Sequence, residues 1–249
     1  MGDEATPRRS RGALVAINLV GLLLVAAFLG LGIWQVQRRA WKLDLIARVE
    51  ARVRAEPRPA PGPADWPAIT EEADAYRHLR LTGTFEYDRS TLVQALTAFG
   101  GGFWVLTPLR SDRGFTVLVN RGFVPAERRD PAGWSQPLGT VTLTGLLRVS
   151  EPGGGFLRSN EPATERWYSR DVAAIAGARG LGEVAPYFVD ADAGADAELL
   201  PVGGLTVVSF RNEHLVYALT WFALAAMTIG ALAYLGREAL AGRTRTPPE

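Results

Sequence analysis

The 249-residue chain contains no cysteine, and it has only two methionines and two histidines. Without cysteine it can form no disulfide framework, no thiolate zinc site, and no thiol nucleophile or redox pair. Copper carriers rely on soft sulfur ligands, and Met1 and Met227 are the only methionines available. The composition therefore argues against thiol chemistry and copper transfer.

An excess of charge of one sign is also lacking, because 27 Lys and Arg residues oppose 26 Asp and Glu residues. The middle of the chain is close to neutral and lacks the excess of basic residues that is typical of nucleic-acid binding. The glycine runs at 100–102 and 153–155 lack the lysine and the following helix of a phosphate loop, so we expect turns there.

Catalytic groups are equally scarce. His78 lies in an alternating segment, and we expect a solvent-facing or hydrogen-bonded strand histidine there rather than a catalytic one. Asp190, Asp192 and Asp196 alternate with small residues without the spacing of a calcium loop, which predicts a solvated acidic loop. Since no nucleophile, base and orienting group can be assembled, we expect no enzyme.

Two long charge-free apolar runs stand at opposite ends of the chain, Gly12 to Gln37 and Leu215 to Gly236. As helices they would be roughly 39 and 33 Å long, enough to cross a hydrocarbon core of about 30 Å. The first run is too long for a signal-peptide core and ends in GIWQVQRR, so we expect it to remain as an anchor. The sequence predicts a membrane protein with two transmembrane helices flanking one extramembrane domain.

The predicted organisation has seven parts. They are a cytoplasmic tail (1–12), transmembrane helix 1 (13–36), an amphipathic helix extension (37–56), a proline-rich linker (57–67), an extracytoplasmic α+β domain (68–212), transmembrane helix 2 (213–235) and a cytoplasmic tail (236–249). The extension has two interpretations: a helix for the membrane surface or a partner, or, favoured here, a helix that covers the domain's own core.

Period-two patterns of β-branched and aromatic residues predict that the domain is mainly antiparallel β. The expected strands are YRHLRLTGTF, STLVQAL, GFWVLTPL, GFTVLVNRGFV, TVTLTGLLRVS, PYFVDAD and GLTVVSF. The clearest hairpin turns at Ser111 to Gly114, and one short helix is expected after Asp171, with a glycine stop.

Two spans place both termini on one side of the membrane. Long connecting domains translocate largely regardless of charge, so we expect cytoplasmic termini and a domain on the outer face. The dozen residues before the first run are too few for a transit peptide, which favours a bacterial plasma (inner) membrane.

His214 heads the second apolar run. On a helix it would share one face with Tyr217 and Trp221, and Arg211 precedes it by three residues. On these grounds alone an aromatic belt with a snorkelling histidine is favoured over a functional histidine. Small residues four apart, Ala26 with Gly30 and Ala226 with Gly230, predict close packing of the spans on each other or on another membrane protein.

Six segments resemble the Surfeit locus protein 1 family, in order from about Leu31 to Tyr234. They are LGIWQVQRRAWKLDLI, WVLTPL, LVNRGFVP, WYSRDVAAIA, APYFVDAD and PVGGLTVVSFRNEHLVYALTWFALA. The resemblance implies a two-span membrane chaperone of the respiratory chain, acting in cytochrome c oxidase assembly. It also implies help with inserting haem a into the catalytic subunit, and haem binding by the protein itself.

The family's histidine at the start of the second span matches His214, and the tryptophan that follows matches Trp221. Two departures are Phe123, where the family usually has tryptophan, and Glu213, where a second asparagine is common. The first is a conservative aromatic exchange, whereas the second places a carboxylate beside the proposed ligand.

Residues and resemblance together predict that His214 ligates the iron of transiently bound haem a, with the porphyrin against Tyr217 and Trp221. The basic residues that could pair with the propionates are Arg211, Arg38 and Arg39. Expected partners are the oxidase catalytic subunit, haem a synthase and the lipid bilayer. The alternative is a membrane-tethered scaffold that stabilises oxidase intermediates without binding haem, and an outer-face hydrolase ranks third.

Overall fold

The computed structural model describes residues 11–155, 157–196, 198–206 and 212–241. The chain divides into two compact units. One unit holds residues 1–47 and 209–249, and the other holds residues 48–208. The first is helical and the second is a β domain, and each is described by itself.

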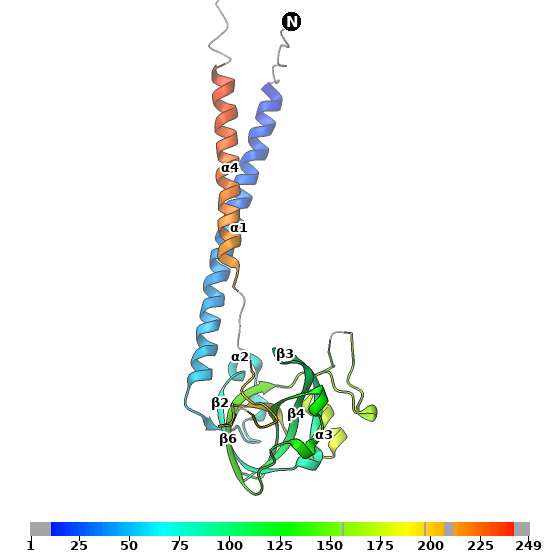
Figure 1. Ribbon diagram of the computed structural model, residues 1–249. Helices are drawn as coiled ribbons and strands as arrows, with labels where there is room; N and C mark the ends of the chain where they lie inside the picture. Colours follow the sequence, from blue (N-terminus) through cyan, green and yellow to red (C-terminus); the bar gives the residue numbers. More distant parts are fainter. Residues whose placement is uncertain (1–10, 156, 197, 207–211, 242–249) are drawn as a thin grey trace, which may run out of the picture. The chain divides into compact units, whose positions relative to one another are not determined.

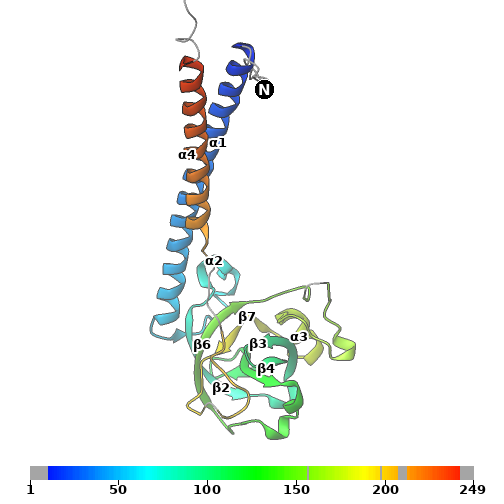
Figure 2. The same cartoon turned by 45° about the horizontal axis from the view of Figure 1, so that its top comes forward.

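The helical unit consists of α4 (His214–Ala241) and most of α1 (Arg11–Arg54), which lie side by side in Figures 1 and 2. By length and composition, Gly12–Arg54 and His214–Glu238 are both apolar enough to cross a membrane. The structure thus supplies two candidate spans, as predicted, at the two ends of the chain.

Glycines on α1 allow close contact with α4. A Cβ atom at Gly21 would lie 2.5 Å from Leu232 Cδ2, and one at Gly32 would lie 2.5 Å from Phe222 Cε1. Between these two positions the rings of Phe28 and Trp221 stack, with centroids 5.8 Å apart. Small residues therefore do bring the two helices together, as in many membrane helix pairs.

The small residues singled out in the sequence are not the ones in this contact. Added Cβ atoms at Gly30 and Gly230 would meet nothing within 4 Å, and Ala26 and Ala226 are exposed. The two helices do pack on each other, but the expectation that these small-residue pairs mediate the contact is wrong. They face outward, because the contact stripe follows Gly21, Phe28 and Gly32 instead.

The β domain is built on one seven-stranded sheet, in the order β1-β2-β6-β7-β5-β4-β3. Its strands are β1 (Arg58–Pro59), β2 (His78–Phe85), β3 (Thr91–Thr97), β4 (Gly100–Ser111), β5 (Thr116–Pro125), β6 (Val141–Val149) and β7 (Val184–Ala191). An additional pairing of β2 with β4 closes strands β2, β6, β7, β5 and β4 into a barrel. Closure leaves no free edge within that ring.

The sheet is mainly antiparallel, as expected, but it is not purely so. Most neighbours are antiparallel, but β1 pairs with β2, and β5 with β7, in parallel. The second case arises because β7 follows β6 and α3 (Val172–Arg179) and then inserts between β6 and β5. Period-two patterning marks a strand without fixing the direction of its neighbour.

Local predictions within the domain are confirmed. The β4–β5 hairpin turns at 111–114, where Gly114 has a φ of +84°. Asp171 caps α3 by accepting a hydrogen bond from the Ala174 amide at 3.1 Å, and Gly180 ends it with a φ of +62°. The expected strand GLTVVSF is not one at 204–206, and its remaining residues lie outside the described part.

Both faces of the central strands are buried. Val117 and Val119 point into the barrel with Tyr187, while the intervening Leu118 packs outside with Ile175 of α3. Short helical segments complete the domain: η1 (Trp66–Ala68), α2 (Glu71–Asp74), η2 (Tyr87–Arg89), η3 (Ala126–Arg128), η4 (Pro131–Gly133) and η5 (Pro162–Thr164). Phe123 is 1% exposed and packs edge-on against Trp104, so phenylalanine fits at this position.

The proline-rich segment and the end of α1 pack on the domain. Tyr187 donates a hydrogen bond to the Pro61 carbonyl at 2.7 Å, and β1 pairs with β2. Val49 is 4% exposed, and Arg52 donates to the Ala75 carbonyl. The last turns of α1 thus behave as a helix that covers the domain.

Candidate functional site

His214 is the first residue of α4, and its ring is fixed by a residue of the other helix. Its Nδ1 atom lies 2.7 Å from Oε1 of Gln35 on α1. An amide oxygen only accepts hydrogen bonds, so Nδ1 carries the hydrogen in this contact. The neutral ring then has its lone pair on Nε2, the atom available to bind a metal ion.

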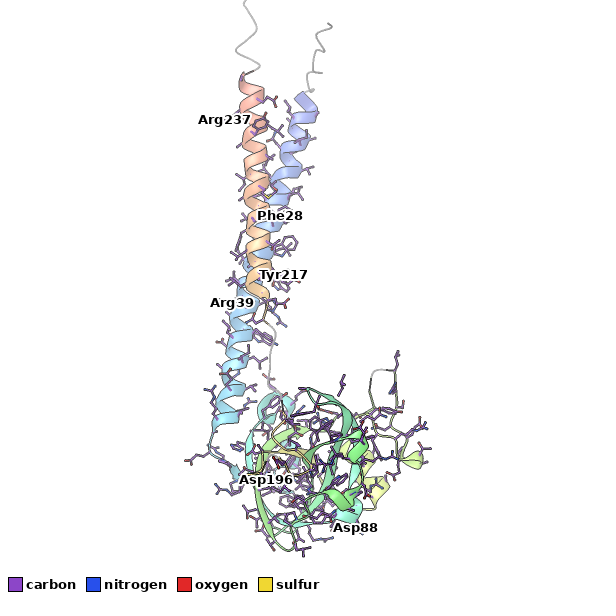
Figure 3. The ribbon with its side chains drawn as sticks, viewed as in Figure 1. Phe28, Arg39, Asp88, Asp196, Tyr217 and Arg237 are labelled. Atoms are coloured by element: carbon purple, nitrogen blue, oxygen red, sulfur yellow. The ribbon has the colours of Figure 1, made fainter. Side chains whose placement is uncertain are left out.

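A small open cavity lies beside this pair. Its volume is about 280 Å³, and it is lined by Gln35, Glu213, His214 and Tyr217. Tyr217 is 52% exposed, one turn along α4 from the histidine. Figure 3 labels Tyr217 near the beginning of α4, with Arg39 on the neighbouring stretch of α1. The structure therefore brings His214 and Tyr217 together at one opening of the helix pair.

Trp221 occupies a different place. It lies two turns into α4, is half-buried, and stacks on Phe28 with an interplanar angle of 25°. It does not line the cavity beside His214. One face of its indole ring is therefore occupied by Phe28 of α1.

The basic residues predicted to lie near the site differ in their surroundings. The Arg38 guanidinium sits 4.0 Å from the centre of the Trp41 ring, a cation–π contact. Arg39 follows Gln35 by one helical turn and lies on the same side of α1. Arg211 lies outside the described residues.

His78, the other histidine, is part of the domain's scaffold. Its Nε2 atom lies 2.7 Å from Asp192 Oδ2, and its Nδ1 atom lies 3.0 Å from the Ala55 carbonyl oxygen. The Asp192 carboxylate also accepts a hydrogen bond from Thr144 at 2.5 Å. Both ring nitrogens are thus engaged, which confirms a hydrogen-bonded strand histidine.

Asp190 is not part of a solvated loop, so that expectation is wrong for this residue. Its side chain is 4% exposed and forms ion pairs with Arg148 at 2.9 Å and Arg170 at 3.3 Å. It also accepts hydrogen bonds from Asn120 and Thr206. The carboxylate belongs to β7, whose register carries it to the barrel wall where two arginines balance its charge.

An open cleft of about 1200 Å³ on the domain has Tyr87, Trp134 and Trp167 among its lining residues. Burial raises the pKa of Tyr87, and it lowers the pKa of neighbouring Arg121, whose guanidinium lies over the Tyr87 ring.

Across the described ranges, no group of three or more His, Asp or Glu side chains is arranged to hold a metal ion.

Gln35 is a site residue that was not predicted from the sequence. It is a polar side chain within the first apolar run, and such residues in membrane spans usually face a partner or a pathway. That signal was present, but its partner was not, because the contact joins residues 179 positions apart.

Comparison with known proteins identifies the family of this chain. The chain matches the SURF1 family over residues 22–226. It is 39% identical over 227 residues to "Surfeit locus protein 1" of Mus musculus, covering 83% of this chain and 71% of that protein. The human protein of the same name is 38% identical over 233 residues, covering 85% and 75%.

A "SURF1-like protein" of Monosiga brevicollis is 36% identical over 224 residues, with 84% and 83% coverage. These relatives come from eukaryotes, so they lend no support to the predicted bacterial membrane. The family match covers the whole β domain and part of each candidate membrane helix. The chain belongs to the SURF1 family, known for cytochrome c oxidase assembly factors.

Proposed function

We propose that this protein is an assembly factor for haem-copper cytochrome c oxidase that binds haem a through His214 and assists its insertion into the catalytic subunit. Family membership supports the oxidase assembly role. The arrangement of the helix pair supports the haem step. Haem a is cargo in this proposal, and haem a synthase and the oxidase catalytic subunit are its source and destination.

The observation that carries the proposal is the contact between His214 and Gln35. Imidazole is a normal axial ligand of haem iron. Metal-binding histidines commonly donate their second N–H to an acceptor, which fixes the tautomer and the ring orientation. The 2.7 Å contact at Nδ1 provides that acceptor and leaves Nε2 for iron.

The open cavity suits a cargo that must be released. Its volume of about 280 Å³ lies near the lower end for ligand pockets. It would enclose one edge of a porphyrin, with Tyr217 beside it, and leave the rest accessible. In this proposal the apolar tail of haem a remains in lipid, and Arg39, one helical turn after Gln35, pairs with a propionate.

Both candidate spans cross one membrane in this proposal. The termini then share the cytoplasmic side and the β domain lies on the outer face, as for a multi-pass protein. The short segment before the first apolar run favours the bacterial plasma membrane as the location. Protease protection of the domain in sealed vesicles tests the orientation.

A scaffold without haem is the second candidate function. The observation in its favour is that Gly30 and Gly230 have open space around them. Small residues with no neighbour in the chain offer a surface on which another membrane helix can pack closely. In that case the protein would hold oxidase subunits together through its helices, and His214 would be dispensable.

The decisive experiment compares visible spectra of the full chain purified from membranes that also contain haem a synthase. The variants are wild type, His214→Ala and the matched control His78→Gln, which changes the other histidine. We expect bound haem in the wild type and the control, and its loss in His214→Ala. Full haem retention by His214→Ala contradicts the ligand assignment. Absence of haem from all three supports the scaffold.

A further inference from the structure

The tip of the β3–β4 hairpin is unusually apolar for a surface turn. Leu96 is 87% exposed and Phe99 is 62% exposed. The hairpin holds them in place, because Leu96 pairs with Gly101 across the ladder and the Phe99 ring stacks on buried Phe123, with centroids 6.4 Å apart. Two large apolar side chains are thus presented to solvent on an ordered support.

This tip lies beside the point at which the chain leaves the domain toward α4. A cleft of about 490 Å³ has Leu96, Phe99, Leu205 and Thr206 among its lining residues. The Thr206 hydroxyl donates to buried Asp190 at 2.9 Å, which anchors this exit. His214 follows Thr206 by eight residues, a reach of at most about 29 Å.

A cationic side chain is close to the same hairpin. Arg158 Nη1 lies 3.4 Å from the Gln94 side-chain oxygen on β3, two residues before Leu96. Leu157, next to it, is 89% exposed. Exposed leucine and phenylalanine with a neighbouring arginine are the side chains that bind the boundary between acyl chains and anionic headgroups.

We propose that the β3–β4 tip inserts into the interfacial layer of the bilayer and makes a third membrane contact, through Leu96 and Phe99. The inference rests on the proposed membrane crossing of α1 and α4. Tethering favours lipid over a protein partner, because the short connection to α4 keeps the tip at high effective concentration near the membrane. The contact would limit the rotation of the domain on the outer face.

The absence of cysteine makes a direct test possible. Ala98 is exposed and lies between the two apolar residues, so Ala98→Cys carries an environment-sensitive fluorophore without removing either of them. The full chain is placed in vesicles of phosphatidylcholine and phosphatidylglycerol. We expect a blue-shifted emission that is quenched by spin-labelled lipids, and loss of most of that quenching when Leu96→Ser and Phe99→Ser are added.

The matched control is Leu138→Cys, at a side chain that is 93% exposed. Leu138 lies just before Val141, the first residue of β6. Val141 pairs with Gly83, which also pairs with Ser111 at the last position of β4. Leu138 is therefore near the end of β4 that lies away from the β3–β4 tip, which is at Gly100. We expect no lipid quenching there. If a label at Ala98 behaves like the one at Leu138, the proposal is overturned. A blue shift at Ala98 without lipid quenching also overturns it and indicates a protein contact.

A label at Ile229→Cys, in the middle of α4, separates this inference from the proposed topology. Ile229 is 50% exposed within the helical unit. Quenching at Ile229 without quenching at Ala98 rejects the hairpin contact alone. Absence of quenching at Ile229 rejects the membrane crossing on which both proposals depend.

Discussion

Gln35 Oε1 accepts a hydrogen bond from His214 Nδ1 across 2.7 Å, joining the two apolar helices at the beginning of α4. If this contact orients the haem ligand, Gln35→Leu should weaken haem a binding by roughly 10- to 100-fold, as for other partners of metal-binding histidines. Titration of haem into the purified variant measures the change. Gln37→Leu, at an exposed position on the same helix, is the control and should bind as the wild type does.

The reduction potential of the bound haem provides a second readout for Gln35. Losing the hydrogen bond at Nδ1 makes the imidazole less basic and leaves its ring free to rotate. The remaining bound haem should therefore show a shifted reduction potential, which a purely structural role would not produce. Unchanged affinity and potential would contradict a positioning role.

Gly32 should be less tolerant of a side chain than Gly30. A Cβ atom at Gly32 would lie 2.5 Å from the Phe222 ring, whereas one at Gly30 meets nothing within 4 Å. Gly32→Ile should therefore separate α1 from α4 and lower the SDS concentration at which helicity is lost. Gly30→Ile is the matched control for the change in volume. Equal effects at the two positions would show that α1 and α4 do not pack as described.

Asp190 should be essential for the stability of the barrel. Its buried carboxylate balances Arg148 and Arg170, and removing one member of a buried ionic group typically costs about 3–5 kcal/mol. Thermal unfolding of the full chain should show a large decrease in midpoint for Asp190→Ala. Asp196→Ala, at an exposed site, should leave the midpoint within about 2 °C of wild type. A small effect at Asp190 would mean that Glu151, which pairs with both arginines, is sufficient to balance them.

Glu165 should give the domain a modest dependence on acid. Hydrogen bonds from Arg179 lower the pKa of Glu165 below its usual value of 4.5. The ion pair therefore stabilises the fold above pH 4.5, and this contribution is lost as the pH falls through the lowered folded pKa. Because the carboxylate is largely exposed, the contribution is less than about 1 kcal/mol.

The measurement compares unfolding midpoints of wild type and Glu165→Gln at pH 7, 5 and 3. The difference between them should be present at pH 7 and 5 and should shrink at pH 3. Exposed Glu183→Gln should match the wild type at each pH. A difference that grows as the pH falls would have the wrong sign for this ion pair.

Local features of this chain were readable from its residues. The apolar runs predicted both long helices, the alternation of residues predicted β2 to β7, and Asp171 and Gly180 marked the ends of α3. These features depend on residues a few positions apart: the period of apolar residues sets the type of element, and capping residues set the ends of a helix. The six-segment resemblance likewise identified the family from sequence alone.

Contacts between distant segments were decided only by the tertiary structure. Register in β7 buried Asp190 against two arginines, although its sequence context is that of an acidic loop. Pairing of β2 with β4 closed the barrel, and the insertion of β7 beside β5 made the sheet mixed. The pairing of Gln35 with His214 depends on which faces of two helices meet, and that is set by the packing of Gly21 and Gly32 rather than by either helix alone.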